Sequence, residues 1–146
     1  MDDVTPFART LRILWAAICV GGAVVLVVMG GLATTAGTAL PELAQEAFYL
    51  VALASLGGLG AALFLVRTME GRLIQAGSDA EAQAIIRSMG VSALALVDAT
   101  AVAAGVAAFL TGDLLVLAFG FPLFAFAWMT WPSDGRVARW LAMRTW

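Results

Sequence analysis

Four apolar runs, each long enough to cross a membrane as a helix, constrain this chain more than any other feature of its sequence. A helix that crosses the hydrocarbon core needs about 20 mostly apolar residues. Four segments qualify and contain no arginine: approximately Ile13–Ala33, Ala47–Val66, Met89–Leu110 and Leu114–Trp131. With 62% hydrophobic residues, the chain has more apolar surface than a soluble domain of 146 residues can bury. The sequence predicts an all-α membrane protein, a four-transmembrane-helix antiparallel bundle formed by a single domain, residues 1–146.

The first apolar run also has some features of a signal peptide. Arg9 and Arg12 precede it, and Gly37-Thr38-Ala39 after it is similar to a cleavage site. The run is longer than the roughly 7–15 apolar residues of a signal sequence. We therefore expect it to be a spanning helix of the protein.

The arginines predict the orientation of the bundle. All eight basic residues are arginines, and they lie before the first run, between the second and third, and after the fourth. The connections Thr34–Glu46 and Thr111–Asp113 contain none. Because arginine is enriched on the cytoplasmic side, both termini are expected there (N-in/C-in). Five tryptophans near the same face are typical of an interfacial belt: Trp15, Trp128, Trp131, Trp140 and Trp146. We expect a multi-pass protein of the bacterial inner (plasma) membrane.

The connections carry helix-stop and helix-start signals. Gly77 followed by Ser78 and Glu81 reads as a helix end and then a capping box, so the second helix should reach about Ala76. Both helices then continue past the apolar runs, which predicts a helical hairpin over residues 67–88 that projects into the cytoplasm. On the outer side, Thr111–Asp113 is expected to form a tight turn.

Short interfacial helices are expected at both ends of the chain. Thr5-Pro6 has the composition of a helix start ahead of Arg9 and Arg12. After Pro132, an amphipathic helix should place its arginines toward headgroups and its apolar residues toward acyl chains. Those apolar residues are Val137, Trp140 and Leu141. Anchoring at the interface and docking to a partner are the two interpretations of this helix.

Small residues at four-residue spacing predict where the helices pack, because they allow close contact in lipid. The third helix carries Ala95, Ala99 and Ala103, with Gly105 on a neighbouring stripe, and the second carries Gly57, Gly58 and Ala61. These two helices are expected to be tightly apposed. The fourth is expected to be kinked at Pro122 and to face lipid or another protein through its aromatic residues and those that follow it. These are Phe119, Phe121, Phe124, Phe126, Trp128, Trp131 and Trp140.

Asp98 is the candidate functional residue, because it lies near the middle of the third run. An aspartate at the centre of a spanning helix costs about 2.5–3.5 kcal/mol on insertion scales, so it should face the bundle interior or water. Ser55, at similar depth on the second helix, is a candidate hydrogen-bond partner. The Ala118 carbonyl is another, since Pro122 lacks the N–H that would bind it in an α-helix.

Three interpretations of Asp98 remain open at this point. It can bind a proton or a cation; it can tie the bundle together as a hydrogen-bonded acid; or it can pair with an arginine of another subunit. No second acid, histidine or lysine lies at membrane depth to form a relay with it.

The second hairpin resembles the ring subunit of rotary ATPases. In that family a small-residue helix, a polar cytoplasmic loop and a second helix with a central carboxylate carry protons. The matching pieces are Gly57-Gly58-x-Gly60, Glu70-Gly71-Arg72 and Asp98, which together span about a third of the chain. The resemblance implies proton carriage at Asp98. The longer glycine repeat and the Arg-Gln-Pro loop of many members are absent, and two further helices flank the hairpin.

Absent residue types narrow the function. The chain has no histidine and a single cysteine, Cys19, so haem, copper, zinc and disulfide chemistry are not expected, nor is any cofactor. No nucleophile–base pair or phosphate loop indicates an enzyme, and no basic stretch indicates nucleic acid. The first hypothesis is an accessory or structural subunit of a larger membrane protein complex, in contact with lipids and with other subunits or itself. The alternative is a small proton- or cation-translocating protein that uses Asp98, alone or as an oligomer.

Overall fold

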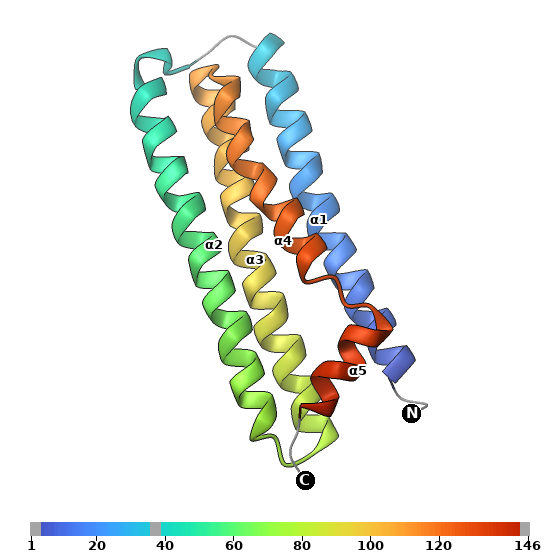
Figure 1. The fold of residues 1–146 in the computed structure, drawn as a ribbon. Coiled ribbons are helices and arrows are strands. Elements are labelled where there is room, and N and C mark those ends of the chain that lie inside the picture. The colour runs from blue at the N-terminus through green and yellow to red at the C-terminus, as the bar shows by residue number, and fades with distance from the viewer. Residues whose placement is uncertain (1–3, 36–38, 144–146) are drawn as a thin grey trace.

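The computed structural model describes residues 4–35 and 39–143, and these residues are almost entirely helical (Figure 1). The α-helices are α1 (Val4–Thr35), α2 (Ala44–Ile74), α3 (Asp79–Thr111), α4 (Phe121–Met129) and α5 (Asp134–Ala142). Two 3-10 segments join them: η1 (Pro41–Leu43) precedes α2, and η2 (Leu114–Gly120) leads directly into α4. No β-strand occurs in the described ranges, so the prediction of an all-α protein is confirmed.

Three helical stretches are long and apolar enough to cross a membrane: Thr5–Thr35, Pro41–Ile74 and Asp79–Thr111. They contain the first three predicted spans and continue beyond them. A fourth candidate combines Leu114–Met129 with α5, but the two parts meet at a bend of 70°. Over the described residues, the bundle therefore holds three uninterrupted candidate spans and one broken candidate.

The fourth segment differs from the helix expected over Leu114–Trp131, which was predicted to be kinked at Pro122. Its first seven residues are 3-10 helix, and the α-helix that follows ends at Met129. The expected kink is thus a change of helix type, with Pro122 in the first turn of α4, where a missing N–H is tolerated. Seven 3-10 residues at about 2.0 Å and nine α residues at about 1.5 Å give a length of about 27 Å. The 3-10 segment thus brings a 16-residue stretch close to the roughly 30 Å hydrocarbon thickness.

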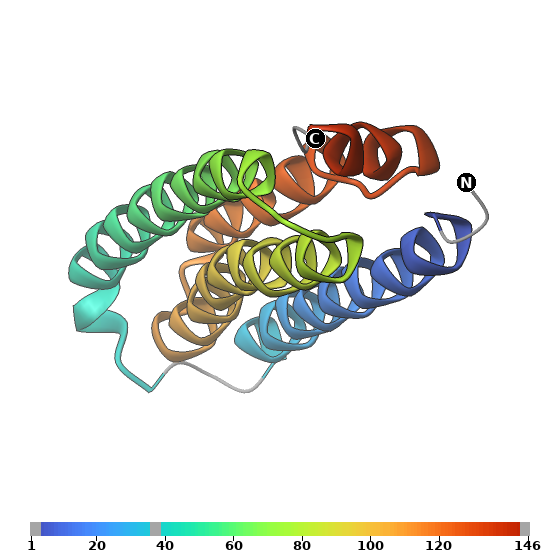
Figure 2. The same ribbon diagram turned by 90° about the horizontal axis from the view of Figure 1, so that it is seen from below.

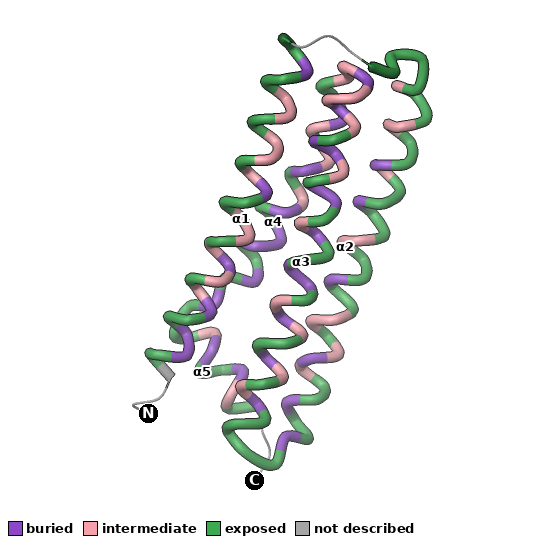
Figure 3. The backbone as a smooth tube through the Cα atoms, turned by 180° about the vertical axis from the view of Figure 1, so that it is seen from behind, coloured by how far each residue is buried: buried purple, intermediate pink, exposed green. Residues whose placement is uncertain are grey.

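α3 is the central helix of the bundle (Figures 1 and 2). α1 and α2 each contact α3 but do not contact each other over their described residues, and η2 and α4 also pack on α3. In its most apolar stretch 44% of α3 is buried inside the protein, against 17% for α2 and 11% for α1 (Figure 3). The rest of the described chain therefore covers only a small part of each of the two flanking helices.

Glycines at the contacts let α1 and α2 lie close to α3. A Cβ added at Gly105 would lie 3.2 Å from Val25 Cγ1 and 3.5 Å from the Val25 carbonyl oxygen of α1. A Cβ added at Gly58 would lie 2.7 Å from Cγ2 of Thr100 on α3. Gly105 therefore lies where α1 and α3 are in close contact, and Gly58 lies where α2 and α3 are in close contact.

The alanine stripe expected on the third helix does not form the buried face of α3. Ala95 and Ala99 are exposed in the single chain, and so are Gly57 and Ala61 of α2, while Ala103 is half-buried. The buried alanines and glycines of α3 are Ala82, Gly90, Ala93, Ala101, Ala104, Gly105 and Ala108. Four-residue spacing identifies faces that can pack, but α3 has neighbours on several sides. The positions of α1 and of η2 with α4 therefore decide which face is covered.

The predicted turns at both ends of α3 are present. The Ser78 hydroxyl accepts a hydrogen bond from the Glu81 N–H at 3.2 Å, and the Glu81 carboxylate accepts one from the Gly77 N–H at 2.8 Å. At the other end Gly112 has a φ of 75°, in the left-handed region that favours glycine, and its N–H donates to the Ala108 carbonyl. The Asp113 carboxylate then accepts from the Leu115 N–H at 2.9 Å.

The first part of α1 packs against α5, which also contacts α2 and α3. Arg12 of α1 donates to Asp134 at the start of α5 at 2.6 Å, and the Trp15 indole N–H donates to the Thr130 hydroxyl at 3.3 Å. Trp15 is almost completely buried. These contacts hold the first turns of α1 against the segment between α4 and α5.

Two expectations for the chain ends are corrected by this packing. The residues around Arg9 and Arg12 do not form a separate short helix but belong to the continuous α1, since no helix-breaking residue separates them from Ile13. α5 is present, yet Val137 and Trp140 are buried in the protein core and not turned toward acyl chains. The apolar face of α5 is covered because the 70° bend turns it onto the end of the bundle.

Candidate functional site

Asp98 lies on α3, 13 residues before the helix ends at Thr111. At about 1.5 Å per residue, this places it about 20 Å from the C-terminal end of α3, within the stretch that is long and apolar enough to cross a membrane. The side chain as a whole is only partly buried.

One carboxylate oxygen of Asp98 is sealed inside the bundle. Oδ1 has less than 1 Å² of exposed surface, and no donor of the described residues lies within hydrogen-bond distance of it. A Cβ added at Gly22 of α1 would lie 2.5 Å from this oxygen and 2.5 Å from Cδ2 of Leu123 on α4. The carboxylate therefore occupies space that Gly22 leaves free, where α1, α3 and α4 meet.

No basic side chain in the described part of the chain neutralises Asp98. Arg12 forms an ion pair with Asp134, but this pair lies at the end of the bundle. A negative charge on Asp98 would have no compensating partner, which is costly inside hydrocarbon.

Ser55, the expected partner of Asp98, binds a different group. Its hydroxyl is buried and donates to the Phe119 carbonyl at 3.2 Å. In 3-10 geometry the donor for this carbonyl would be the nitrogen of Pro122, which has no N–H. The Ala118 carbonyl, the other expected partner, accepts instead from the Phe121 N–H. In the 3-10 form, the carbonyl that lacks a backbone N–H donor is therefore that of Phe119 and not that of Ala118.

Ser55→Ala is expected to lower the free energy of unfolding by about 1 kcal/mol, because the buried Phe119 carbonyl then loses this donor. Unfolding in mixed micelles with increasing dodecyl sulfate measures the loss. Ser92→Ala, at an exposed position of α3, is the matched control and should change stability by less than about 0.5 kcal/mol. Equal stability of both variants and the wild type would contradict the role given to Ser55.

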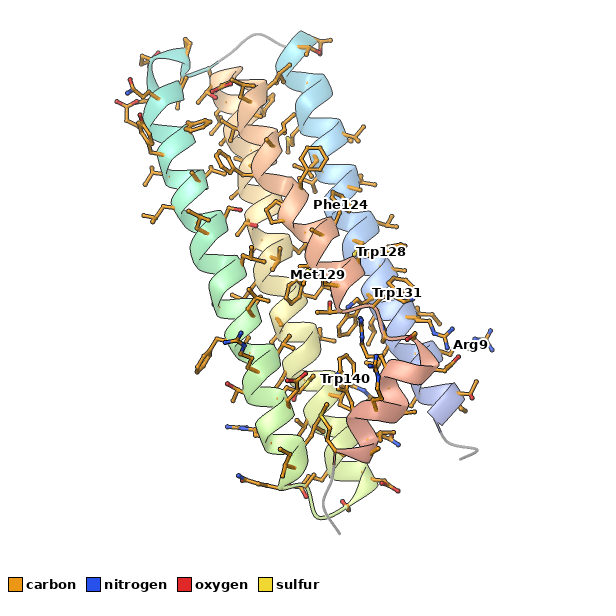
Figure 4. All side chains as sticks on the ribbon, viewed as in Figure 1. Arg9, Phe124, Trp128, Met129, Trp131 and Trp140 are labelled. Carbon is orange, nitrogen blue, oxygen red and sulfur yellow. The ribbon has the colours of Figure 1, made fainter. Side chains whose placement is uncertain are left out.

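The predicted lipid-facing or partner-facing aromatic residues separate into two groups (Figure 4). Phe126 and Trp140 are buried, and Phe119 is half-buried with its ring edge-on to Phe48. The exposed group is Phe121, Phe124, Trp128 and Trp131. Trp15, expected in the interfacial belt, is also buried, and Trp146 lies outside the described residues. Only part of the aromatic set therefore faces the surroundings.

Gly22 and Leu123 belong to the Asp98 site, although they were not predicted as site residues. The pair Gly21-Gly22 was visible as small residues in the first run. The two glycines differ only in the direction they face: Gly21 has nothing within 4 Å of an added Cβ, whereas Gly22 meets Asp98. The rotation of α1 about its axis decides which of the two glycines faces Asp98, and this rotation cannot be deduced from a single sequence.

The described residues contain no group of three or more histidine, cysteine, aspartate or glutamate side chains that could hold a metal ion. Comparison of the chain with family models, with curated proteins and with solved structures found no match.

Proposed function

We propose that the chain is a four-span protein of the bacterial inner membrane, with both termini in the cytoplasm. The length of about 27 Å for Leu114–Met129 supports a fourth crossing beside the three long helices. The starts of α1 and α5 lie at the same end of the bundle as the α2–α3 turn (Figure 1). The arginines of the described residues lie in these segments or in the parts of α2 and α3 that lead to the turn: Arg9, Arg12, Arg67, Arg72, Arg87, Arg136 and Arg139. The positive-inside rule favours the cytoplasm for this end.

In this membrane the protein binds a proton or a small cation at Asp98 and translocates it. The main support for this proposal is that Oδ1 of Asp98 is buried and has no hydrogen-bond donor among the described residues. An ionised carboxyl group at this depth needs a positive partner, and a proton or a cation supplies one. The partial exposure of the Asp98 side chain leaves a way for that partner to enter and leave. The Ser55 hydroxyl donates to the Phe119 carbonyl and not to Asp98, which argues against a purely structural hydrogen bond between Ser55 and Asp98.

Reconstitution of the purified full chain into liposomes tests this function. With a potassium diffusion potential imposed by valinomycin and a pH-sensitive dye inside, we expect acidification above that of empty liposomes. Dicyclohexylcarbodiimide reacts with protonated carboxyl groups in apolar surroundings, so it should stop the flux and label Asp98 in peptide mapping. If neither proton nor sodium moves faster than through empty liposomes, the translocation proposal is wrong.

A second candidate function is that of an accessory subunit in a larger membrane complex. The observation that favours it is an apolar groove of about 460 Å³ between α2 and α3, lined in part by Ala99 and Ala103. Exposed Ala95 continues this small-residue face along α3. Small residues at four-residue spacing let another helix approach closely in lipid. The groove and the alanines thus offer a docking face for a helix of another subunit.

Mild-detergent extraction from the native membrane tests the accessory role. The expected result is one defined assembly that contains this chain and other subunits. Ala99→Phe, which fills the groove face, should release the chain from the assembly, whereas Ala17→Phe on the exposed side of α1 should not. Recovery of the wild type as an active monomer would contradict the accessory role.

A further inference from the structure

An exposed row of aromatic side chains runs along the fourth segment toward α5 (Figure 4). Phe121, Phe124 and Trp128 are three and four residues apart, so they lie on one face of α4. Trp131 follows beyond the end of the helix and lines the same pocket as Trp128. Trp128 is 81% exposed, although tryptophan is one of the largest apolar side chains. No other segment of the described chain therefore covers the exposed side of this row.

The outer part of this row borders an apolar groove of about 330 Å³ between α1 and the fourth segment. Gly30 and Gly31 of α1 form part of its wall, and their lack of side chains leaves the space open. Leu117, Phe121 and Phe124 form the opposite wall. The groove has the apolar lining that a hydrocarbon chain requires.

The inner part of the row opens into a second pocket, of about 380 Å³, that carries a positive charge. Trp128, Trp131, Ser133 and Arg136 line it. The Arg136 guanidinium donates to the Trp131 carbonyl at 3.0 Å, which holds it at the bend between α4 and α5. The nearest acid in sequence, Asp134, is already paired with Arg12 at 2.6 Å. Among the described residues no carboxylate pairs with Arg136, so its remaining N–H groups are available to an anion.

We infer that these two pockets together bind one anionic phospholipid of the cytoplasmic leaflet. The phosphate is bound by the Arg136 guanidinium, which can donate two parallel hydrogen bonds to it, and by the Ser133 hydroxyl. Trp128 and Trp131 lie at the level of the headgroup and the ester groups, where tryptophan is enriched. One acyl chain follows Phe124 and Phe121 into the inner end of the apolar groove, which these two side chains line.

The dimensions fit such a ligand. At about 1.5 Å per residue, the distance along the segment from Phe121 to Trp131 is about 15 Å. This equals half of the roughly 30 Å hydrocarbon thickness, the depth that the chain of one leaflet fills. A free phosphate would use Arg136 but leave the apolar groove empty. The combined lining of the two pockets therefore favours a lipid over a soluble anion.

The lipid site rests on the membrane placement proposed above, because that placement puts Arg136 at headgroup level. It does not depend on Asp98 or on proton flux. Asp98→Asn should therefore retain the lipid, and loss of lipid binding need not stop the flux.

Native mass spectrometry of the full chain, released from micelles that contain phosphatidylglycerol and phosphatidylcholine, tests the site. We expect the wild type to retain phosphatidylglycerol in preference to phosphatidylcholine. Arg136→Gln should reduce this retention about tenfold, since a charged hydrogen bond to the phosphate is lost. Arg139→Gln is the matched control, because Arg139 is exposed on the same helix and does not line the pocket. Phe124→Ala should lower the retention of both lipids.

Three results would overturn the lipid site. The first is equal retention of the two lipids by the wild type. The second is equal loss in Arg136→Gln and Arg139→Gln, which would indicate attraction to the general positive charge of α5. The third is displacement of the lipid by millimolar inorganic phosphate, which would indicate a site for a soluble anion. An unchanged thermal unfolding midpoint for Arg136→Gln shows that lost binding does not reflect misfolding.

Discussion

Asparagine in place of Asp98 is expected to reduce proton flux through the reconstituted protein to the level of empty liposomes. Asparagine has nearly the shape of aspartate, so it fits the space beside Gly22 and Leu123. It cannot take up or release a proton in the physiological range, so a site that works by exchange at this carboxyl group loses its chemistry. Since Oδ1 makes no hydrogen bond with the described residues, the bundle should remain folded. We expect a fall in flux of at least about tenfold, measured with the same dye and potential as for the wild type.

Two further variants separate this effect from a loss of fold. Asp98→Glu keeps a carboxyl group and should retain part of the flux. Glu42→Gln removes an exposed acid from η1 at the outer end of the bundle and should leave the flux unchanged. Carbodiimide labelling should disappear in Asp98→Asn and persist in Glu42→Gln. Undiminished flux in a well-folded Asp98→Asn protein would show that the carboxyl group is not the carrier.

Leucine in place of Gly105 is expected to destabilise the bundle by about 2–3 kcal/mol, the upper part of the range for overpacking a close contact. An added Cβ already lies 3.2 Å from Val25 Cγ1, 3.4 Å from Met29 Cβ and 3.5 Å from the Val25 carbonyl oxygen. These atoms are close to the backbone of α1, so they cannot rotate away as the end of a long side chain can. The larger side chain must therefore push α1 away from α3.

Gly57→Leu is the matched control, because Gly57 was predicted from the same small-residue pattern but has nothing within 4 Å of an added Cβ. We expect a change of less than about 0.5 kcal/mol in this variant. Unfolding by dodecyl sulfate in mixed micelles compares the two variants under one condition. Similar destabilisation by both variants would contradict this packing of α1 and α2 around α3.

The α3 termini show what local sequence signals can predict. Ser78 and Glu81 form the expected capping interactions, and Gly112 and Asp113 form the expected turn. These features depend on residues within one turn of each other, so a single sequence contains the necessary information. The helical class and the positions of the three long apolar helices follow in the same way, from hydropathy summed over about 20 neighbouring residues.

The environment of Asp98 shows what local signals leave out. Its depth could be predicted, since depth depends on position along one helix. Its neighbours could not: Ser55 was expected beside it, whereas Gly22 and Leu123 are there. Which side chains meet depends on the rotation of each helix about its axis, and that rotation is set by contacts between residues far apart in the chain.

The sequence by itself determined that the chain is helical, where its long apolar helices lie and how α3 begins and ends. Only the tertiary structure decided that α3 is central, that Ala95 and Ala99 are exposed, and that α5 turns its apolar face onto the bundle. It also decided that Ser55 binds Phe119, because the 3-10 form of η2 shifts the unpaired carbonyl by one residue. The physical reason is the same in each case. Hydropathy and capping act within a few turns of one helix, whereas packing in lipid selects among several small-residue faces that look alike in sequence.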